Sequence, residues 1–254
     1  MTPLTISRPP ASAGLLWIKE GWRLFKQAPI PWMGMTALVF MVVIGVNMIP
    51  WIGRYAIELF SPFLVAGYFS ASRAAMAGEP VTFIHLGAGS RNGRDALLRI
   101  GVAYLAGSLL IFALINLLTG SDLRMLLQQA QDPTALSPTE FNRRIASALP
   151  AMLLASILFT PLLMATWFSP GLALFDAFPA GRSLWWSLWA CWVNWRPILY
   201  YSLVLGVLGA VALIIPFGLG MLVFLPLTLI STYVAYRMIF TPSEEPLMER
   251  DASP

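Results

Sequence analysis

The sequence predicts an all-α fold: a polytopic membrane bundle of about six transmembrane helices, with two interfacial amphipathic helices and an internal parallel repeat. Composition supports this prediction, because 58% of the 254 residues are hydrophobic and only 11% are charged. An ordinary soluble domain has about 25% charged residues. A soluble core cannot bury so much apolar surface, whereas lipid can face the surplus. Long apolar segments and a repeated arrangement of Trp and Pro are the other two observations.

The apolar segments are long enough to cross a bilayer, which requires about 20 apolar residues. The first of them contains no charged residue. Arg54 and Glu58 lie one turn apart at the start of the second, where we expect the membrane interface. Arg99 lies near the start of the third, where its side chain can reach water. The six predicted spans are 32–49, 55–77, 97–118, 146–168, 197–215 and 221–239.

Two stretches of the chain repeat the same order of residues. Pro62 precedes Arg73 by eleven residues, and Pro226 precedes Arg237 by the same number. The repeat predicts two copies, about 15–77 and 180–240, within a single integral membrane domain covering 15–240. Both copies enter the membrane from the same side, so an axis along the membrane normal would relate them. We expect disordered ends at 1–14 and 241–254, the latter acidic.

Each copy begins with an amphipathic segment that a proline ends. In 15–28 the apolar face is predicted to hold Leu15, Ile18, Trp22 and Phe25, with basic residues opposite, which is typical of a helix lying among lipid headgroups. In 180–196, Trp185, Trp189 and Trp192 share one face at helical spacing, and indole rings favour the membrane interface. Pro29 and Pro197 end the two segments.

The copies are joined by 78–179, which contains a polar loop at 119–147. Within it, 121–131 is expected to form a short helix. Ser137, Pro138 and Glu140 form a typical helix start, so we expect a helix that continues directly into the fourth span. The loop is interpreted as a solvated connector on the extracytoplasmic side.

Basic residues predict the orientation of the chain, because cytoplasmic loops carry an excess of Lys and Arg. With both termini in the cytoplasm, twelve basic residues lie inside and four outside. The N-terminal residues do not show the basic region followed by a short apolar region that is typical of a cleavable signal peptide, so none is expected. The inside residues are Arg8, Lys19, Arg23, Lys26, Arg73, Arg91, Arg94, Arg99, Arg182, Arg196, Arg237 and Arg250; the outside ones are Arg54, Arg124, Arg143 and Arg144.

The side chains that carry chemistry are few and isolated. His85 is the single histidine and Cys191 the single cysteine, so neither a metal cluster nor a catalytic triad is indicated. Asp176 is expected to cap a helix or to pair with Arg182. Glu58 is the best candidate for an ionisable group inside the membrane, but we expect it close to the outer boundary.

We therefore predict no catalytic, cofactor-binding or metal-binding residue, and no cofactor. The glycine-containing stretch 87–93 lacks the spacing of a nucleotide-binding loop and is interpreted as a flexible basic loop. The residues expected to contact lipid headgroups are Lys19, Arg23, Lys26, Arg91, Arg94, Trp185, Trp189 and Trp192.

Three stretches resemble an uncharacterised family of six-span inner-membrane proteins from Gram-negative bacteria. They are 21–29 (GWRLFKQAP), 187–197 (SLWACWVNWRP) and 231–240 (STYVAYRMIF). The middle stretch is also similar, more loosely, to Yip1-type membrane domains and to the membrane domains fused to glycerophosphodiester phosphodiesterases. The first resemblance covers most of the chain and implies a location in the bacterial inner (cytoplasmic) membrane. It implies no activity.

These observations predict a non-enzymatic membrane protein that organises lipid, especially anionic lipid, or binds partner membrane proteins. The alternative is a small transporter or channel for an apolar or amphiphilic solute. A membrane-embedded enzyme ranks third, because it would need converging acid, base or metal-binding groups. No nucleic-acid partner is expected, and a homo-oligomer is compatible with the sequence.

Overall fold

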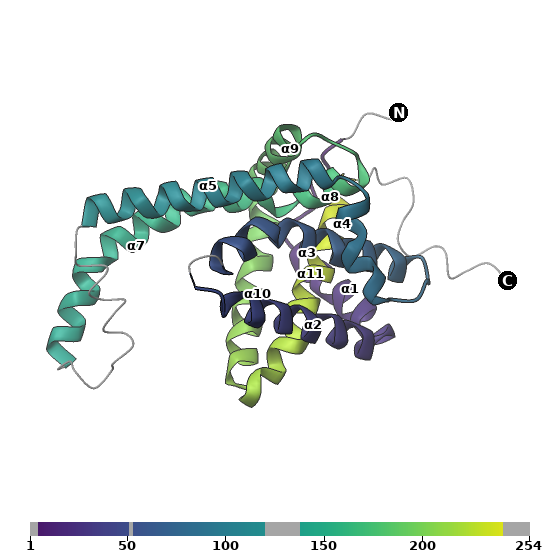
Figure 1. Cartoon of the computed structure of the whole chain (residues 1–254), viewed down its shortest axis with the longest axis horizontal. Helices are drawn as coiled ribbons and strands as arrows, with labels where there is room; N and C mark the ends of the chain where they lie inside the picture. Colours follow the sequence, from purple (N-terminus) through teal and green to yellow (C-terminus); the bar gives the residue numbers. More distant parts are fainter. Residues whose placement is uncertain (1–4, 51–52, 120–137, 241–254) are drawn as a thin grey trace.

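A computed structural model of the chain describes residues 5–50, 53–119 and 138–240, and this part contains helices and no strands. Three helical hairpins extend from a body of shorter helices (Figure 1). The hairpins are α2 (Pro29–Asn47) with α3 (Gly53–Met76), α5 (Arg94–Thr119) with α7 (Pro138–Trp167), and α10 (Trp195–Ile214) with α11 (Leu219–Phe240). The shorter elements are α1 (Ala13–Gln27), η1 (Phe83–Gly87), α4 (Ala88–Arg91), α8 (Ser169–Phe175), α9 (Ala180–Val193) and η3 (Pro216–Gly218).

Five stretches of the described chain are long and apolar enough to span a membrane, which confirms the predicted helical membrane fold. They match five of the six predicted spans. The predicted span 55–77 is helical as α3, but α3 is not among the five, and Arg54, Glu58 and Arg73 reduce its apolar character. The five are Pro29–Asn47, Arg94–Leu117, Leu149–Phe175, Trp195–Ile214 and Leu219–Phe240.

The helix start predicted at Pro138 is confirmed. The helix α7 begins at that residue and runs without interruption to Trp167, through Pro150 and Pro161. Lipid-embedded helices tolerate internal prolines because neighbouring groups satisfy the freed carbonyls. Ser137, the short helix predicted at 121–131 and the disordered tail predicted at 241–254 lie outside the described residues.

The body of the protein is packed around α11. Phe69 of α3 meets Tyr233 of α11 with ring centroids 5.5 Å apart. Each of these residues lies seven positions after its proline, Pro62 or Pro226, so corresponding positions of the two repeat copies touch at the contact between α3 and α11. On the other side of α11, Trp17 of α1 packs edge-on against Tyr201 of α10, with centroids 5.6 Å apart.

The buried face of α1 matches the predicted one only in part. Ile18 and Phe25 are buried as predicted. Leu15 and Trp22 are exposed, whereas Trp17 and Leu24 are buried. Two glycines determine which face packs: a Cβ at Gly14 would lie 2.6 Å from the Pro197 carbonyl oxygen, and one at Gly21 would lie 2.8 Å from Ser231 Cβ. Their missing side chains let the backbone of α1 lie directly on α10 and α11. This close approach of the backbones determines which face of α1 is buried. The hydrophobic pattern of the sequence alone does not reveal that face.

The amphipathic helices of the two copies have different neighbours. The first, α1, packs on α11 and α10, whereas the second, α9, packs on α7 and α8. In Figure 1, α9 lies beside the start of the long arm that α5 and α7 form, away from α1. The helix α9 is therefore not covered in the way that α1 is. The face that α9 leaves exposed differs from the face that α1 leaves exposed.

Candidate functional site

The helix α9 has its two serines turned toward the protein and three of its Trp side chains turned outward. Ser183 and Ser187 are both completely buried. Trp185, Trp189 and Trp192 are 65%, 48% and 66% exposed, respectively. Such an exposed aromatic patch is unfavourable in water. Patches of this kind therefore mark surfaces that contact a partner or a membrane. The same arrangement is favourable at a membrane interface, where an indole ring meets lipid and its N–H meets water or headgroups.

Ser187 fixes α9 at the junction of α7 and α8. Its hydroxyl donates to the Met164 carbonyl at 2.7 Å and accepts the Phe168 amide N–H at 2.9 Å. In an unbroken helix those two backbone groups would bond to each other. The serine hydroxyl is inserted between them, so it satisfies both groups at the break and holds α9 against α7.

Cys191 lies one turn further along the same buried face and points its sulfur at the same Met164 carbonyl, 3.6 Å away. Burial raises the pKa of this thiol well above its ordinary value. The reactive form of cysteine is the thiolate, so Cys191 stays protonated at neutral pH. Its role here is packing between α9 and α7.

Asn194 ties the end of α9 to the N-terminal segment. Its amide nitrogen donates to the Ser7 carbonyl at 3.1 Å, and the Ser7 N–H donates to the Ile239 carbonyl at 2.8 Å. These bonds connect α9 through residues near the N-terminus to the end of α11. The buried face of α9 is thus held near its middle by Ser187 and at its C-terminal end by Asn194, while its Trp face points outward.

An apolar groove of about 560 Å³ lies between the Trp face and α7. We call it the α7–α9 groove. Thr160 contributes a polar group, but its hydroxyl already donates to the Ser156 carbonyl at 2.7 Å. The groove therefore offers hydrocarbon-like contacts. Its lining residues are Ile157, Thr160, Pro161, Met164, Trp185, Leu188, Trp189 and Trp192.

The predicted headgroup-contact residues lie on four separate elements. Lys19, Arg23 and Lys26 are exposed on α1, and Arg23 forms an ion pair with Glu20 at 2.8 Å. Arg91 and Arg94 are exposed at α4 and at the start of α5, and the three Trp residues lie on α9. The structure does not gather them into one pocket, and their contact with lipid stays a prediction.

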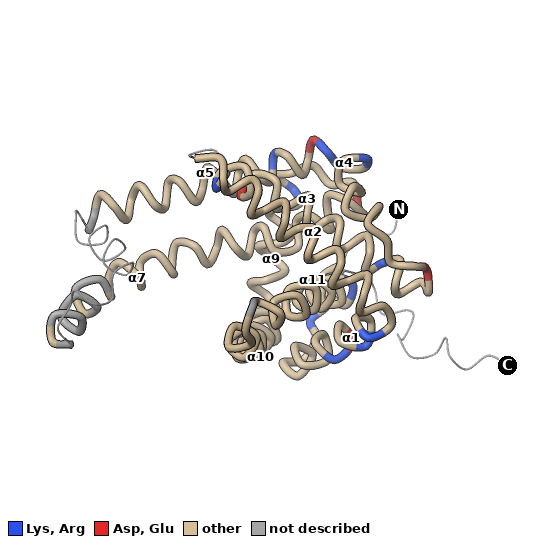
Figure 2. Tube along the Cα trace, turned by 60° about the horizontal axis from the view of Figure 1, so that its bottom comes forward, with Lys and Arg blue, Asp and Glu red and all other residues tan. Residues whose placement is uncertain are grey.

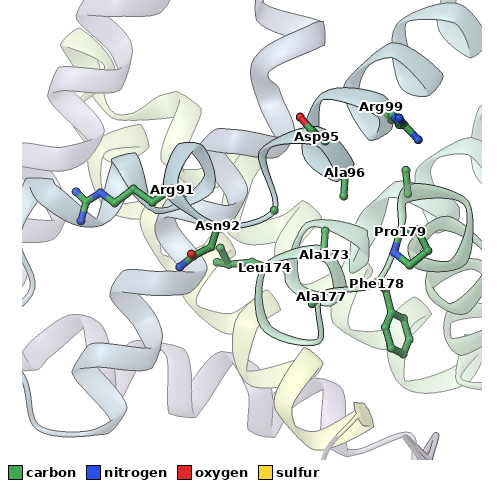
Figure 3. Close-up of a pocket in the computed structure, with 12 residues that line it drawn as sticks. Arg91, Asn92, Asp95, Ala96, Arg99, Ala173, Leu174, Ala177, Phe178 and Pro179 are labelled. Carbon is green, nitrogen blue, oxygen red and sulfur yellow. The ribbon is translucent and has the colours of Figure 1, made fainter.

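A polar hollow of about 640 Å³ lies between the start of α5 and the turn that joins α8 to α9 (Figure 3). Arg91 and Arg99 are at its rim. In Figure 3 the Arg91 side chain points away from the hollow, and its guanidinium donates to the Ile84 carbonyl at 3.2 Å. Asp95 brings a negative charge to the same rim, which weakens any preference of the hollow for anions.

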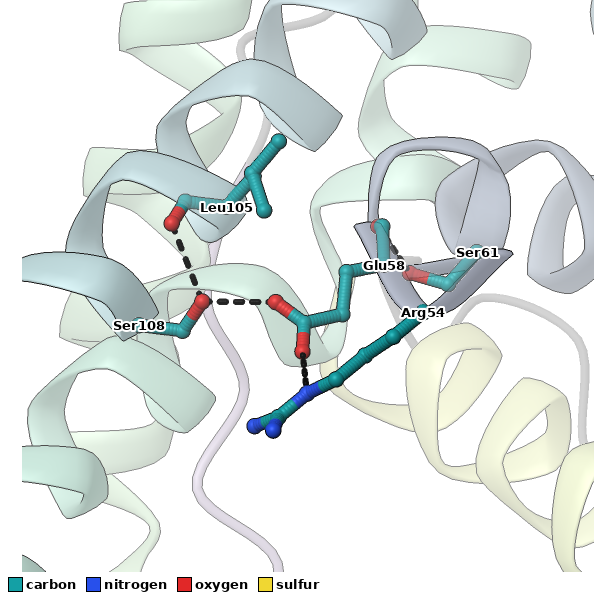
Figure 4. Close-up of polar contacts among 5 residues, drawn as sticks. All are labelled: Arg54, Glu58, Ser61, Leu105 and Ser108. Atoms are coloured by element: carbon teal, nitrogen blue, oxygen red, sulfur yellow. Dashed lines mark hydrogen bonds and ion pairs between the residues drawn. The ribbon is translucent and has the colours of Figure 1, made fainter. Parts of the chain in front are cut away.

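Glu58 connects α3 to α5. Its carboxylate accepts a hydrogen bond from Ser108 at 2.7 Å and one from Arg54 at 3.3 Å (Figure 4). Ser108 is near the middle of the apolar stretch Arg94–Leu117, so Glu58 contacts α5 about half-way along that stretch. The expected place of Glu58 close to the outer boundary of the membrane stays a prediction. The contact could not be read from the sequence, because the two residues are 50 positions apart.

Asp176 does not pair with Arg182. Its carboxylate accepts a hydrogen bond from the Tyr236 hydroxyl at 2.6 Å, while the Arg182 guanidinium stacks 4.0 Å above the Phe178 ring. Asp176 also stands at the C-terminal end of α8 and so cannot cap a following helix at its N-terminus. Burial raises the pKa of Asp176, and the hydrogen bond from Tyr236 opposes that shift.

His85 has only weak polar contacts. Its Nδ1 lies 3.4 Å from the Ser70 hydroxyl and its Nε2 lies 3.4 Å from the Pro80 carbonyl. In residues 5–50, 53–119 and 138–240, no three His, Cys, Asp or Glu side chains gather in a way that could hold a metal ion. The contact between His85 and Ser70 joins η1 to α3.

The chain is similar to a probable inner membrane protein from Burkholderia thailandensis. The two are 27% identical over 243 residues, which cover 89% of this chain and 87% of the relative. No family model matches the chain, and no solved structure matches it. A similarity along almost the whole length, together with the apolar helices of the structure, confirms the resemblance to inner-membrane proteins of Gram-negative bacteria.

Proposed function

We propose that the chain is a non-enzymatic inner-membrane protein that organises phospholipid at the cytoplasmic leaflet through the Trp face of α9. The observation that carries this proposal is the reversed polarity of α9, whose serines are buried and whose Trp185, Trp189 and Trp192 project outward. A surface of indole rings at the end of a spanning helix partitions into the headgroup region.

The distribution of charge supports the orientation. In Figure 2 basic residues lie over α1 and α4, whereas α2 carries no charged residue. The helix α10 carries only Arg196, and α7 has no charged residue after Arg144. Cytoplasmic ends of spanning segments are enriched in Lys and Arg. The body that carries α1 and α9 would therefore face the cytoplasm, together with both termini.

The experiment compares the lipid surrounding the protein with the bulk membrane. We would extract the full chain with its lipid in polymer-bounded discs and measure the ratio of phosphatidylglycerol to phosphatidylethanolamine. The wild type should enrich phosphatidylglycerol. Replacing all three Trp residues with Ala should return the ratio to the bulk value, because each lost indole removes on the order of 1 kcal/mol of interfacial contact.

The matched control replaces Leu203, Val207 and Val211 with Ala. These α10 side chains are 61%, 65% and 54% exposed, so the control removes apolar surface without removing an indole. It should leave the enrichment unchanged. A triple Trp variant with the enrichment of the wild type would exclude the proposal.

One observation favours a second function, the transport of an amphiphilic solute. Glu58 is an ionisable group that contacts the middle of the apolar helix α5, and ionisable groups inside a membrane often mark transport paths or proton relays. Its bonds to Ser108 and Arg54 are equally those of a structural link between α3 and α5. Solute uptake into vesicles by the wild type that is lost in Glu58→Gln would favour transport over lipid organisation.

A further inference from the structure

The α7–α9 groove has the properties of a binding site for one hydrocarbon chain. Its volume of about 560 Å³ falls within the ~300–1,000 Å³ of typical small-molecule pockets. Its lining is apolar and aromatic, and its floor is the α7 stretch that includes Pro161 and Met164. That stretch belongs to a predicted span, so the groove continues into the region where lipid chains lie.

The walls of the groove are fixed from behind. The bonds of Ser187 to Met164 and Phe168 hold α9 on α7, so the groove does not depend on a flexible surface. A preorganised site avoids the cost of ordering its own side chains when a ligand binds. The Trp side chains lose little freedom when they are covered, because each has only two rotatable side-chain bonds.

Basic residues flank the Trp face, and no acidic residue lies between 180 and 196. Arg182 precedes Trp185 by three positions, so the two lie on neighbouring parts of one helical face. Its guanidinium is held by stacking on Phe178, which leaves its N–H edge able to donate. At the other end Arg196 stacks on Trp195, 5.4 Å from the ring centroid. Neither arginine lines the groove itself, but the two guanidinium groups flank the Trp face and can pair with an anionic headgroup.

We propose that the α7–α9 groove binds one acyl chain of an anionic phospholipid whose headgroup pairs with Arg182. This inference rests on the proposed function and makes it specific, because it distinguishes one retained lipid from the general lipid surroundings. A phospholipid joins the two features in one ligand: a hydrocarbon chain for the groove and a phosphate for the guanidinium.

The test is native mass spectrometry of the full chain in mild detergent, with phosphatidylglycerol and phosphatidylethanolamine of identical acyl chains added. The wild type should retain one phosphatidylglycerol. Thr160→Trp places a bulky ring in the groove from an exposed position, and it should lower retention at least about tenfold because the acyl chain loses its apolar contacts. Ile157→Trp, also at an exposed lining position, provides a second filled groove if the first variant does not fold.

Leu153→Trp is the matched control. Leu153 is on the same helix and 56% exposed, but it does not line the groove. This variant should retain lipid as the wild type does. Arg182→Gln should keep the chain-binding groove and reduce the preference for phosphatidylglycerol over phosphatidylethanolamine several-fold.

Three outcomes would overturn the inference: a wild type that retains no phospholipid, equal retention by the Thr160→Trp and Leu153→Trp chains, or a dimer of the wild type that Thr160→Trp abolishes. The last result would assign the groove to a second copy of the chain. The disc experiment reports separately on the proposed function. If discs of the wild type enrich phosphatidylglycerol while detergent-purified protein retains none, only the groove proposal fails.

Discussion

At the scale of single residues, Ser187 shows how one hydroxyl connects three helices. It joins the end of α7 to the start of α8 and holds α9 beside them. A buried backbone amide or carbonyl without a partner costs about 1–3 kcal/mol. The serine is therefore more than a small residue at a helix contact, because two backbone groups of a broken helix depend on it.

Ser187→Ala should destabilise the protein by about 1–3 kcal/mol, because the Phe168 N–H and the Met164 carbonyl lose their partner. The measurement is the thermal midpoint of the purified protein in detergent. Ser156→Ala is the matched control, since Ser156 is exposed and its hydroxyl only donates back to the Met152 carbonyl of its own helix. Equal midpoints for the two variants would contradict the role assigned to Ser187.

The sequence predicted the three Trp residues of the candidate site on one face, because helical spacing is visible along the chain. It did not predict the bonds of Ser187, whose partners lie 19 and 23 positions away at a helix break. The pairing of Asp176 with Arg182 was wrong for a related reason. The Tyr236 partner is 60 positions away, and closeness in sequence favoured the arginine.

At the scale of elements, α1 and α9 show two outcomes for corresponding helices. The glycines of α1 let its backbone lie directly against α10 and α11. The outer face of α9 instead carries bulky Trp side chains, which no other helix covers in the described chain. The predicted start of α7 was confirmed because proline and capping residues act locally. The buried face of α1 was partly wrong because Trp17 and Trp22 are equally hydrophobic, and only the neighbouring helix decides which is covered.

Gly21→Ala should destabilise the protein by about 1–3 kcal/mol, because the new methyl group would overlap Ser231 and push α1 away from α11. Gly206→Ala serves as the control: it is also a helical glycine, but a Cβ there meets nothing within 4 Å. Its stability should be unchanged or slightly higher, because alanine favours the helix. Thermal unfolding of the two variants side by side tests the contact, and a stable Gly21→Ala chain would contradict it.

At the scale of the whole molecule, the apolar pattern predicted the fold class and five of the spans. It could not show where α3 ends relative to α5, because sequence gives the length of a helix and not its offset from a neighbour. The bond between Glu58 and Ser108, near the middle of α5, was therefore not predicted.

The proposed orientation predicts that a green fluorescent protein fused after Pro254 will fluoresce in cells, because that protein folds in the cytoplasm. Alkaline phosphatase at the same position should stay inactive. The matched fusion at position 120, after α5, should give the opposite pair of results. Active phosphatase at the C-terminal end would reverse the orientation.

The three hairpins are joined to one another near the body and along part of α3, while the far end of the α5–α7 arm projects free of the other two (Figure 1). In that distal part, α5 and α7 pack on each other through a small cluster of Ile111, Ile115 and Ala151. In the described chain, α10 and α11 are not among the main packing partners of α5 and α7. We therefore expect the tilt of the arm to follow the thickness of the surrounding bilayer, since helices adjust to hydrophobic mismatch by tilting. The width of the protein at the end of the arm would then be set by the lipid.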